Sequence, residues 1–314
     1  MLDLVIIGGS AAGCNAAVYA ARRKLNFEMI TSNIGGEVAM SGVVQNWLGE
    51  PAINGFELAQ KFANHVKSYD VKIDEGWWVE KIIQEKKHQI IIARNSAGKE
   101  KKWKTKAVII ATGIHPRQLN IPGEKEFDRK GVTYCSVCDG PLYKNKTTVT
   151  LGSGNSALES ALMMAGIAKK VYLISKYTNT LENNGGFPRG ENILIDKIKS
   201  QPNVEIIYGA TTIAIIGDKK VTGLKYKDVN GQEQMLAVDG IMVHIGMTPN
   251  SQLVDCEKDK MGQIIVDVKC QTSIPGIFAA GDVTNVPYKQ IGIAAGQGIT
   301  AALATIEYLN RWKE

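Results

Sequence analysis

Two glycine-rich loops, each lying between an apolar strand and a helix, constrain the fold of this chain more than any other feature. The first, Gly8-Gly9-Ser10-Ala11-Ala12-Gly13, follows the apolar run at residues 4–7, and the second, Gly152-Ser153-Gly154-Asn155-Ser156-Ala157, follows residues 147–151. Such a turn points backbone N–H groups and a helix N-terminus at a pyrophosphate. The duplication therefore predicts an α/β chain with two Rossmann-like nucleotide folds, one for each of two cofactors.

The first loop departs from the dinucleotide-binding pattern. Ser10 stands where that pattern has its second glycine, so a Cβ lies where a dinucleotide approaches the backbone, although Gly9 can relieve this. A purely structural turn is the alternative, but the preceding strand favours dinucleotide binding. The next strand, at residues 27–30, ends in Thr31-Ser32-Asn33 without an acidic residue to bind a ribose, so hydroxyl groups are expected to take that role.

A second chemical feature is the pair Cys135 and Cys138, followed directly by Asp139. Sulfurs at this spacing can form a reversible disulfide, and Asp139 can move a proton to or from a thiolate, or simply form an Asp-Gly turn. Half of a structural zinc site is the alternative. It is disfavoured because the other cysteines stand alone without a nearby histidine, so no metal is expected.

Length and charge exclude several classes of protein. The 314 residues suffice for two domains, and the net charge of +6 comes from 37 basic and 31 acidic residues without an arginine-rich tract, which argues against nucleic acid as a partner. No apolar run approaches eighteen residues, and the chain enters its first strand without a basic leader. These features predict a cytoplasmic protein that does not enter membranes and whose cysteine pair cycles in a reducing compartment.

Other segments predict the supporting structure. Residues 56–68 have the spacing of a helix that faces the core through Phe56, Leu58, Ala59, Phe62 and Val66. Residues 71–105 alternate as in an antiparallel meander, in which Trp77 and Trp78 are interpreted as packing residues. The last helix, at residues 290–309, carries glycines that are expected to permit close approach at 292, 296 and 298. The histidines at 65, 88, 115 and 244 are interpreted as isolated and as structural or exposed.

Three motifs mark a resemblance: the first to flavoproteins with two dinucleotide-binding domains, and the second and third to the low-molecular-weight thioredoxin reductases among them. They are Ala111-Thr112-Gly113, the run from Cys135 to Gly140 that precedes the second glycine loop, and the tail Thr272-Ser273-Ile274-Pro275-Gly276-Ile277-Phe278-Ala279-Ala280-Gly281-Asp282. The segments Asp139–Tyr143 and Val286–Ile291 are also similar to the flavoprotein component of alkyl hydroperoxide reductase. That component carries an extra N-terminal thioredoxin-like module, for which this chain is expected to have no room.

The resemblance implies two domains of the three-layer ββα type, the second inserted into the first. Residues 1–114 and 247–314 would bind FAD, and residues 115–246 would bind a pyridine nucleotide and carry the cysteine pair. Two proline-bearing crossing segments, at 115–116 and 246–249, would let the inserted domain rotate. The expected cofactor-binding residues are Gly8, Ser10, Ala11, Thr31, Ser32, Gly35, Gly36, Glu37, Asn46, Ala111, Thr112, Gly113, Gly281, Asp282, Lys289, Gln290 and Ile291 for FAD, and Gly152, Gly154, Asn155, Ser156, Lys176 and Arg189 for the nucleotide.

The electron donor is the point at which the sequence departs from the family. The thioredoxin reductases that use NADPH have a His-Arg-Arg cluster after the strand at 171–174, whereas this chain has Ser175-Lys176-Tyr177. A 2′-phosphate needs positive charge there, and the ribose of NADH prefers an acidic residue. Lys176 supplies one cation, or is only a solvated lysine, and Arg189 can supply another. NADPH, NADH and reduced ferredoxin all remain open as donors.

The function implied by the resemblance is that of an FAD-dependent thioredoxin-disulfide reductase, assembled as a homodimer. Cys138 would lie against the isoalloxazine, Cys135 would attack the disulfide of thioredoxin or a similar protein, and Asp139 would be the acid. One alternative is a flavin-dependent dithiol oxidase that runs the same site in reverse. Another is a nucleotide-binding regulatory flavoprotein with vestigial catalysis, which the altered Ser10 and the missing arginines would favour.

Overall fold

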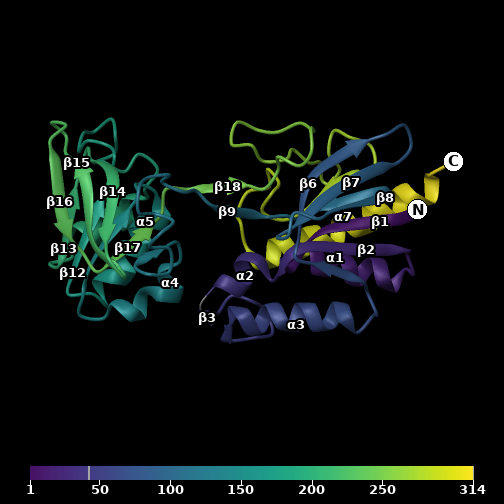
Figure 1. Ribbon diagram of the computed structural model, residues 1–314, viewed down its shortest axis with the longest axis horizontal. Coiled ribbons are helices and arrows are strands. Elements are labelled where there is room, and N and C mark those ends of the chain that lie inside the picture. The colour runs from purple at the N-terminus through teal and green to yellow at the C-terminus, as the bar shows by residue number, and fades with distance from the viewer. Residues whose placement is uncertain (42, 314) are drawn as a thin grey trace. The chain divides into compact units, whose positions relative to one another are not determined.

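The computed structural model describes residues 1–41 and 43–313 of the chain. They form two compact units: unit 1 comprises residues 1–115 and 248–314, and unit 2 comprises residues 116–247. The two units are joined through β9 (Ile114–Pro116) and β18 (Met247–Pro249), which pair as a two-stranded sheet (Figure 1). That unit 1 binds FAD and unit 2 a pyridine nucleotide stays a prediction at this point.

Unit 1 is built on a seven-stranded sheet in the order β5-β2-β1-β8-β7-β6, with β19 also paired to β8. The central strand β1 has an unbroken apolar run because both of its faces are buried: Leu4 and Ile6 face one core cluster, and Val5 and Ile7 face another. The strands are β1 (Leu2–Gly9), β2 (Phe27–Ile34), β5 (Ile73–Glu75), β6 (Trp77–Gln84), β7 (Gln89–Asn95), β8 (Glu100–Ile110) and β19 (Ile277–Ala279).

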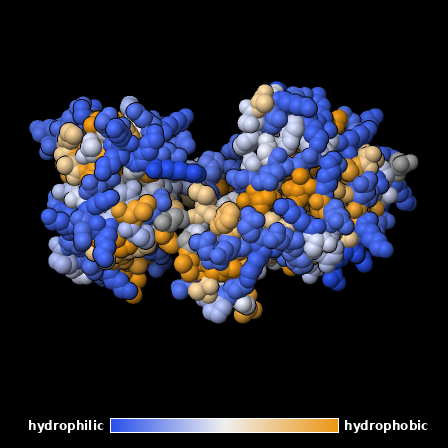
Figure 2. Space-filling view, turned by 60° about the horizontal axis from the view of Figure 1, so that its bottom comes forward, coloured by the Kyte–Doolittle hydropathy of each residue, from blue (hydrophilic) through white to orange (hydrophobic). Residues whose placement is uncertain are grey.

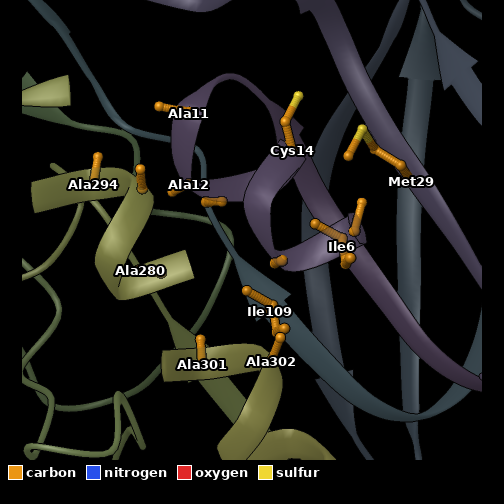
Figure 3. Packing of buried hydrophobic residues seen from close by; sticks show 14 of the residues in the cluster. Ile6, Ala11, Ala12, Cys14, Met29, Ile109, Ala280, Ala294, Ala301 and Ala302 are labelled. Carbon is orange, nitrogen blue, oxygen red and sulfur yellow. The ribbon is translucent and has the colours of Figure 1, made fainter. Parts of the chain in front are cut away.

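Helices cover one face of this sheet and strands extend over the other. The helices are α1 (Ala11–Arg22), α2 (Gly36–Met40), α3 (Gly55–Lys67) and α7 (Ile291–Arg311), and a small antiparallel pair is formed by β3 (Val43–Val44) and β4 (Ile53–Asn54). Small side chains of α1 and α7, among them Ala12 and Ala301, pack in one cluster with Ile6 of β1 and Ile109 of β8 (Figure 3). Alanine is favoured here because a bulkier side chain would hold the two helices apart.

Two expectations for unit 1 are only partly correct. The antiparallel meander is present as β6-β7-β8, but β5 instead extends the sheet in parallel beside β2. The helix expected at 56–68 is present, and Leu58 and Val66 are buried, but Phe56, whose backbone N–H donates to the side chain of the N-cap residue Asn54, is 58% exposed.

Phe56 is not the only exposed apolar side chain in this part of unit 1. Met40, Val43 and Leu48, on α2, β3 and the segment after it, are also exposed. We call these four residues the apolar patch. Figure 2 shows that apolar residues interrupt the largely hydrophilic surface in several places. Patches of this kind on soluble proteins commonly mark contact surfaces.

Unit 2 repeats the same three-layer plan. Its parallel sheet has the order β10-β17-β11-β12-β13; one face packs against helices and the other against an antiparallel three-stranded sheet. The parallel strands are β10 (Val132–Thr133), β11 (Thr147–Leu151), β12 (Lys170–Ile174), β13 (Val204–Ile207) and β17 (Gly240–Val243); the antiparallel ones are β14 (Thr211–Gly217), β15 (Val221–Lys227) and β16 (Glu233–Ala237). The helices are α4 (Ser136–Asp139), the 3-10 helix η1 (Gly140–Tyr143), α5 (Asn155–Ala165) and α6 (Asn192–Lys199).

Of the three glycines in the last helix that were expected to permit close approach of a neighbouring element, only one does so. A Cβ built on Gly298 would lie 2.0 Å from the carbonyl oxygen of Ala12 in α1, whereas no described atom lies within 4 Å of a Cβ on Gly292 or Gly296. The approach of α1 to α7 therefore depends on Gly298.

We expect Gly298→Ala to lower the free energy of unfolding of unit 1 by about 1–3 kcal/mol, because the helices must move apart. Gly296→Ala, in the same helix but facing open space, should be neutral or stabilise the unit by up to about 1 kcal/mol. Urea unfolding followed by tryptophan fluorescence tests this, since all five tryptophans lie in unit 1. Equal effects of the two substitutions would contradict the packing argument.

Candidate active site

The first glycine loop is shaped by backbone contacts that exclude side chains. Gly8 has φ +118°, and a Cβ there would lie 2.1 Å from the carbonyl oxygen of Ala111, just beyond the end of β8. A Cβ on Gly13 would lie 1.9 Å from the carbonyl oxygen of Gly8. The departure at Ser10 is accommodated, because its hydroxyl donates a hydrogen bond of 2.6 Å to the carbonyl of Gly35.

Two adjoining cavities of about 380 and 390 Å³ open around this loop in unit 1. They share lining residues, including Ser10, Asn33 and Thr112, so they form one elongated site on both sides of the loop. Of the seventeen residues expected to bind FAD, all but Gly35 and Asn46 line it: Gly8, Ser10, Ala11, Thr31, Ser32, Gly36, Glu37, Ala111, Thr112, Gly113, Gly281, Asp282, Lys289, Gln290 and Ile291. The carbonyl of Gly35 instead accepts the hydrogen bond from the Ser10 hydroxyl, and the side-chain amide of Asn46 donates a hydrogen bond of 3.0 Å to the side-chain oxygen of Gln290.

Several residues line these cavities that were not expected from the sequence. His115 lies in β9 and Asn250 directly follows β18; His115 Nδ1 lies 2.5 Å from Asn250 Oδ1, and the Asn250 amide donates to the carbonyl of Thr112. Both residues follow shortly after a buried strand, and this position was the signal in the sequence that could have indicated them as site residues. Trp77 and Trp78 both line the cavity. Trp77 also packs edge-on against Trp103, as expected, whereas Trp78 is 52% exposed, so its interpretation as a packing residue is wrong.

Charges in the larger cavity are mixed. Burial raises the pKa of Glu37, and the carboxylate of Asp282 raises it further, against the opposing effect of His115. Burial also raises the pKa of Asp282, partly offset by the ammonium group of Lys289. Burial lowers the pKa of Lys289, which donates hydrogen bonds to two backbone carbonyls of its own loop. Lys289 is therefore held in place while it lines the cavity.

These residues fit an elongated dinucleotide such as FAD. The site has two halves that meet at the glycine loop. Because Gly8 has no side chain, the loop backbone lies directly against the backbone of Ala111. Thr31 and other hydroxyl residues supply polar groups, and Trp78 supplies an indole surface suited to a planar ring. Gly8, Thr31 and Asp282 would hold the dinucleotide across both halves.

The second glycine loop lies in unit 2 and has the same construction. Gly152 has φ +146°, and a Cβ there would lie 2.2 Å from the carbonyl oxygen of His244, just beyond the end of β17. Gly154 caps α5, and no described atom lies within 4 Å of a Cβ there, so a phosphate can approach its backbone closely. The structure brings Arg189 next to this loop, since it forms a parallel β-bridge with Gly154.

The remaining nucleotide-binding candidates are placed as follows. Ser156 is exposed in the first turn of α5, and Asn155 exchanges two hydrogen bonds with Glu191 at the start of α6. Lys176 is exposed at the end of β12, with its ammonium group 5.1 Å from the centre of the Tyr177 ring. Glu191 is a further carboxylate near the loop that the sequence motifs did not indicate.

The cysteine pair lies at the short helix α4 in unit 2. Cys135 is disulfide-bonded; the side chain of Cys138 lies outside the described residues. Thr133 connects the two ends of this segment: its hydroxyl accepts from the backbone N–H of Cys135 over 3.1 Å and donates to the Asp139 carboxylate over 2.5 Å. Asp139 is thus fixed beside the pair.

The serine between the cysteines belongs to a polar network. Ser136 Oγ lies 2.8 Å from His244 Nε2 and 2.5 Å from Ser160 Oγ of α5. Burial lowers the pKa of His244 to about 4, so its ring is neutral at physiological pH. The interpretation of His244 as isolated is therefore wrong. Strand β10, shortly before Ser136, pairs with β17, shortly before His244, only in the folded sheet, so the sequence could not place this histidine next to Ser136.

Neither a metal cluster nor a membrane-spanning helix is found in the described chain. Across residues 1–41 and 43–313, no group of three or more metal-ligating side chains is close enough to hold an ion. In the same residues, no helix has both the length and the apolar character needed to span a bilayer.

Residues 2–298 match the family described as pyridine nucleotide-disulphide oxidoreductases. The chain belongs to this family. Among its relatives, the F subunit of alkyl hydroperoxide reductase from Pseudomonas putida is 42% identical over 313 residues, covering 98% of this chain and 58% of the relative. A protein named NADH dehydrogenase from Bacillus subtilis is 35% identical over 312 residues, covering 98% and 59%. The chain thus spans little more than half the length of these relatives.

Solved structures of similar length share the fold. Thioredoxin reductase from Lactococcus lactis has a TM-score of 0.80 and 31% identity, with 99% of each chain covered. That from T. acidophilum has a TM-score of 0.76 and 37% identity, with 98% of each chain covered. The expected architecture, two Rossmann-like domains of the thioredoxin reductase type, is confirmed. As a member of the pyridine nucleotide-disulphide oxidoreductases, the chain uses FAD and a nicotinamide dinucleotide as cofactors.

The lowered pKa of His244 gives a pH dependence with a defined sign. An unfolded histidine gains a proton below about pH 6.5, whereas the folded one does so only near pH 4, so stability falls as pH falls from 6.5 to 4. We expect unit 2 to lose on the order of 1–3 kcal/mol of unfolding free energy over this range, and His244→Gln to lose less. Amide hydrogen exchange of β11 and β17 in urea measures this.

His65→Gln provides the control for this pH series, since His65 is exposed on α3 in unit 1. It should leave the pH profile of unit 2 unchanged. A wild-type profile that stays flat between pH 6.5 and 4 would contradict the prediction.

Proposed function

We propose that this chain is a disulfide reductase in which Cys135 and Cys138 pass electrons to a disulfide of thioredoxin or a thioredoxin-like protein. The observation that carries the proposal is a disulfide-bonded Cys135 next to a fixed Asp139, within the unit that holds the second glycine loop. In this proposal unit 1 binds FAD and unit 2 binds the pyridine nucleotide. FAD, when bound, supplies the chemistry by which two electrons pass from a nicotinamide to a disulfide.

The roles of the site residues follow from thiol–disulfide exchange. The thiolate of Cys135 attacks one sulfur of the partner disulfide and forms a mixed disulfide, and the partner's other sulfur leaves as a thiolate. Cys138 then attacks Cys135, releases the partner as a dithiol and restores the 135–138 disulfide. The partner gains the two electrons and two protons that the pair loses. Asp139, held by Thr133, is placed to supply a proton to the leaving thiolate.

The surface next to the pair supports a protein as the substrate. Val137 and Leu142, on either side of Asp139, are 54% and 67% exposed. Exposed apolar side chains this close to the cysteine pair in sequence suit a folded partner that buries them on contact. The apolar patch on unit 1 supports a homodimer, because a second copy would cover it.

A partner in peroxide reduction is the second candidate. It is favoured by the relatives that are F subunits of alkyl hydroperoxide reductase. The two candidates differ only in the protein that presents the disulfide, so rates with thioredoxin and with a peroxide-reducing protein, measured side by side, decide between them. Oxidation of small dithiols by oxygen, faster than either rate, would favour the dithiol oxidase instead.

We propose NADH as the electron donor. A 2′-phosphate would meet only the exposed Lys176 and Arg189 among the residues that the sequence indicated for this role, and Ser175 at the end of β12 is buried with its hydroxyl donating to a backbone carbonyl. Relatives named NADH dehydrogenase favour the same donor.

We expect NADH to reduce the bound flavin at least about tenfold more efficiently than NADPH, and Lys176→Ala to change the NADH rate by less than about threefold. Anaerobic stopped-flow reduction with NADH, NADPH and reduced ferredoxin in parallel measures this. Faster reduction by NADPH or ferredoxin would overturn the assignment of the donor and leave that of the cysteine pair intact.

Cys135→Ser and Cys138→Ser should each abolish reduction of a protein disulfide while FAD stays bound, because each removes one sulfur of the pair but no residue of the cavity in unit 1. Cys256→Ser is the matched control, since this free and partly buried cysteine lies in unit 1 outside both cavities. Insulin-coupled thioredoxin reduction and the visible flavin spectrum are the two readouts. Full activity of either pair variant would refute the proposed function.

A further inference from the structure

The two units place different residues at one equivalent position. In unit 1 the backbone N–H of Ala111 bonds to the carbonyl of Ile7 over 2.7 Å, and its own carbonyl meets the first glycine of the loop. In unit 2 the N–H of His244 bonds to the carbonyl of Leu151 over 2.8 Å, and its carbonyl meets Gly152. In both units these contacts with the strand and the glycine loop are made by backbone atoms alone, and an alanine suffices for them in unit 1. The imidazole of His244 is therefore available for another role.

The imidazole is directed to the residue between the two cysteines. His244 Nε2 lies 2.8 Å from Ser136 Oγ, and Ser160 Oγ of α5 lies 2.5 Å from the same atom. Ser136 and Ser160 are only 4% and 5% exposed, so these bonds are shielded from competing water. Three elements, α4, α5 and the end of β17, thus converge on one hydroxyl.

We propose that His244 is a positioning residue for the cysteine pair, acting through Ser136 to fix the backbone turn that separates the two sulfurs. The inference rests on the proposed function and deepens it. The neutral imidazole can accept a hydrogen bond from the Ser136 hydroxyl while that hydroxyl accepts one from Ser160. Alternatively the imidazole donates to Ser136 and Ser136 donates to Ser160, so the Ser136 hydroxyl is paired in both arrangements. These hydrogen bonds hold the turn in addition to the disulfide.

A fixed turn has a measurable consequence for the redox equilibrium. The network coexists with the disulfide-bonded form of Cys135. Holding the turn in this form keeps the sulfurs close after reduction, which raises their effective concentration and favours the disulfide. Removing the network should therefore destabilise the disulfide and raise the reduction potential of the pair.

The test measures the reduction potential of the 135–138 pair in the full chain. The protein is equilibrated in dithiothreitol buffers of defined potential, the thiols are alkylated, and the peptide carrying both cysteines is quantified by mass spectrometry. We expect His244→Leu and Ser136→Ala each to lower the equilibrium constant for the disulfide about tenfold, which is a rise of about 30 mV for two electrons. His244→Gln, whose amide can still bond to Ser136, should stay within about threefold of the wild type.

The double variant His244→Leu/Ser136→Ala isolates the interaction. If the histidine acts through Ser136, the double variant shifts the potential no more than either single variant does. Thr148→Val is the matched control for altered packing in the same sheet, because the buried Thr148 hydroxyl has no hydrogen-bond partner among the described residues and lies outside the network. It should leave the potential unchanged.

Each outcome supports or overturns the inference. Equilibrium constants of His244→Leu and Ser136→Ala within about twofold of the wild type, or additive shifts in the double variant, would overturn it. If His244→Leu does not fold, Ser136→Ala alone still tests the inference, because an equilibrium constant within about twofold of the wild type would overturn it. Failure of the wild-type pair to cycle in any dithiothreitol buffer would instead refute the proposed function. The two failures are thus distinguishable.

Discussion

The contact on which both units depend is the close approach of two backbones, the first glycine of each loop against the carbonyl that follows a neighbouring strand. Gly8 meets Ala111 and Gly152 meets His244 at distances that leave no room for a Cβ. Both glycines also have a positive φ, which side chains other than glycine rarely adopt. The loop, the strand before it and the helix after it are therefore fixed together, and the candidate binding sites lie at the ends of the strands so joined.

The rest of each unit supports this junction in layers. In unit 1 the alanines of α1 and α7 allow two helices to lie close on one face of the sheet (Figure 3), and the strand meander covers the other. The two adjoining cavities lie on both sides of the loop at the edge where the parallel strands end, which is where ligands bind in open α/β sheets. Residues from distant parts of the chain, such as Ser32, Thr112 and Asp282, reach the same cavity for this reason.

Unit 2 uses the same plan for different chemistry. The position occupied by Ala111 in one unit is occupied by a histidine in the other, and that histidine lies beside the serine of the Cys-x-x-Cys segment. Thr133 holds Asp139 from one side and the network holds Ser136 from the other. A short helix of four residues has little stability of its own, so the pair depends on these tertiary contacts for its geometry.

Local signals in the sequence were enough to predict the two glycine loops, the buried strands before them, and the cysteine pair with its aspartate, whereas most residues of the elongated site in unit 1 were expected from the family resemblance. A glycine pattern, an apolar run or a fixed spacing specifies a conformation within a few residues. The assembled fold was needed to show that Gly298 carries the helix contact, that Phe56 and Trp78 are exposed, and that His244 reaches Ser136. The contacts of Gly298 and His244 join elements more than a hundred residues apart, and periodicity within one segment contains no information about its neighbour.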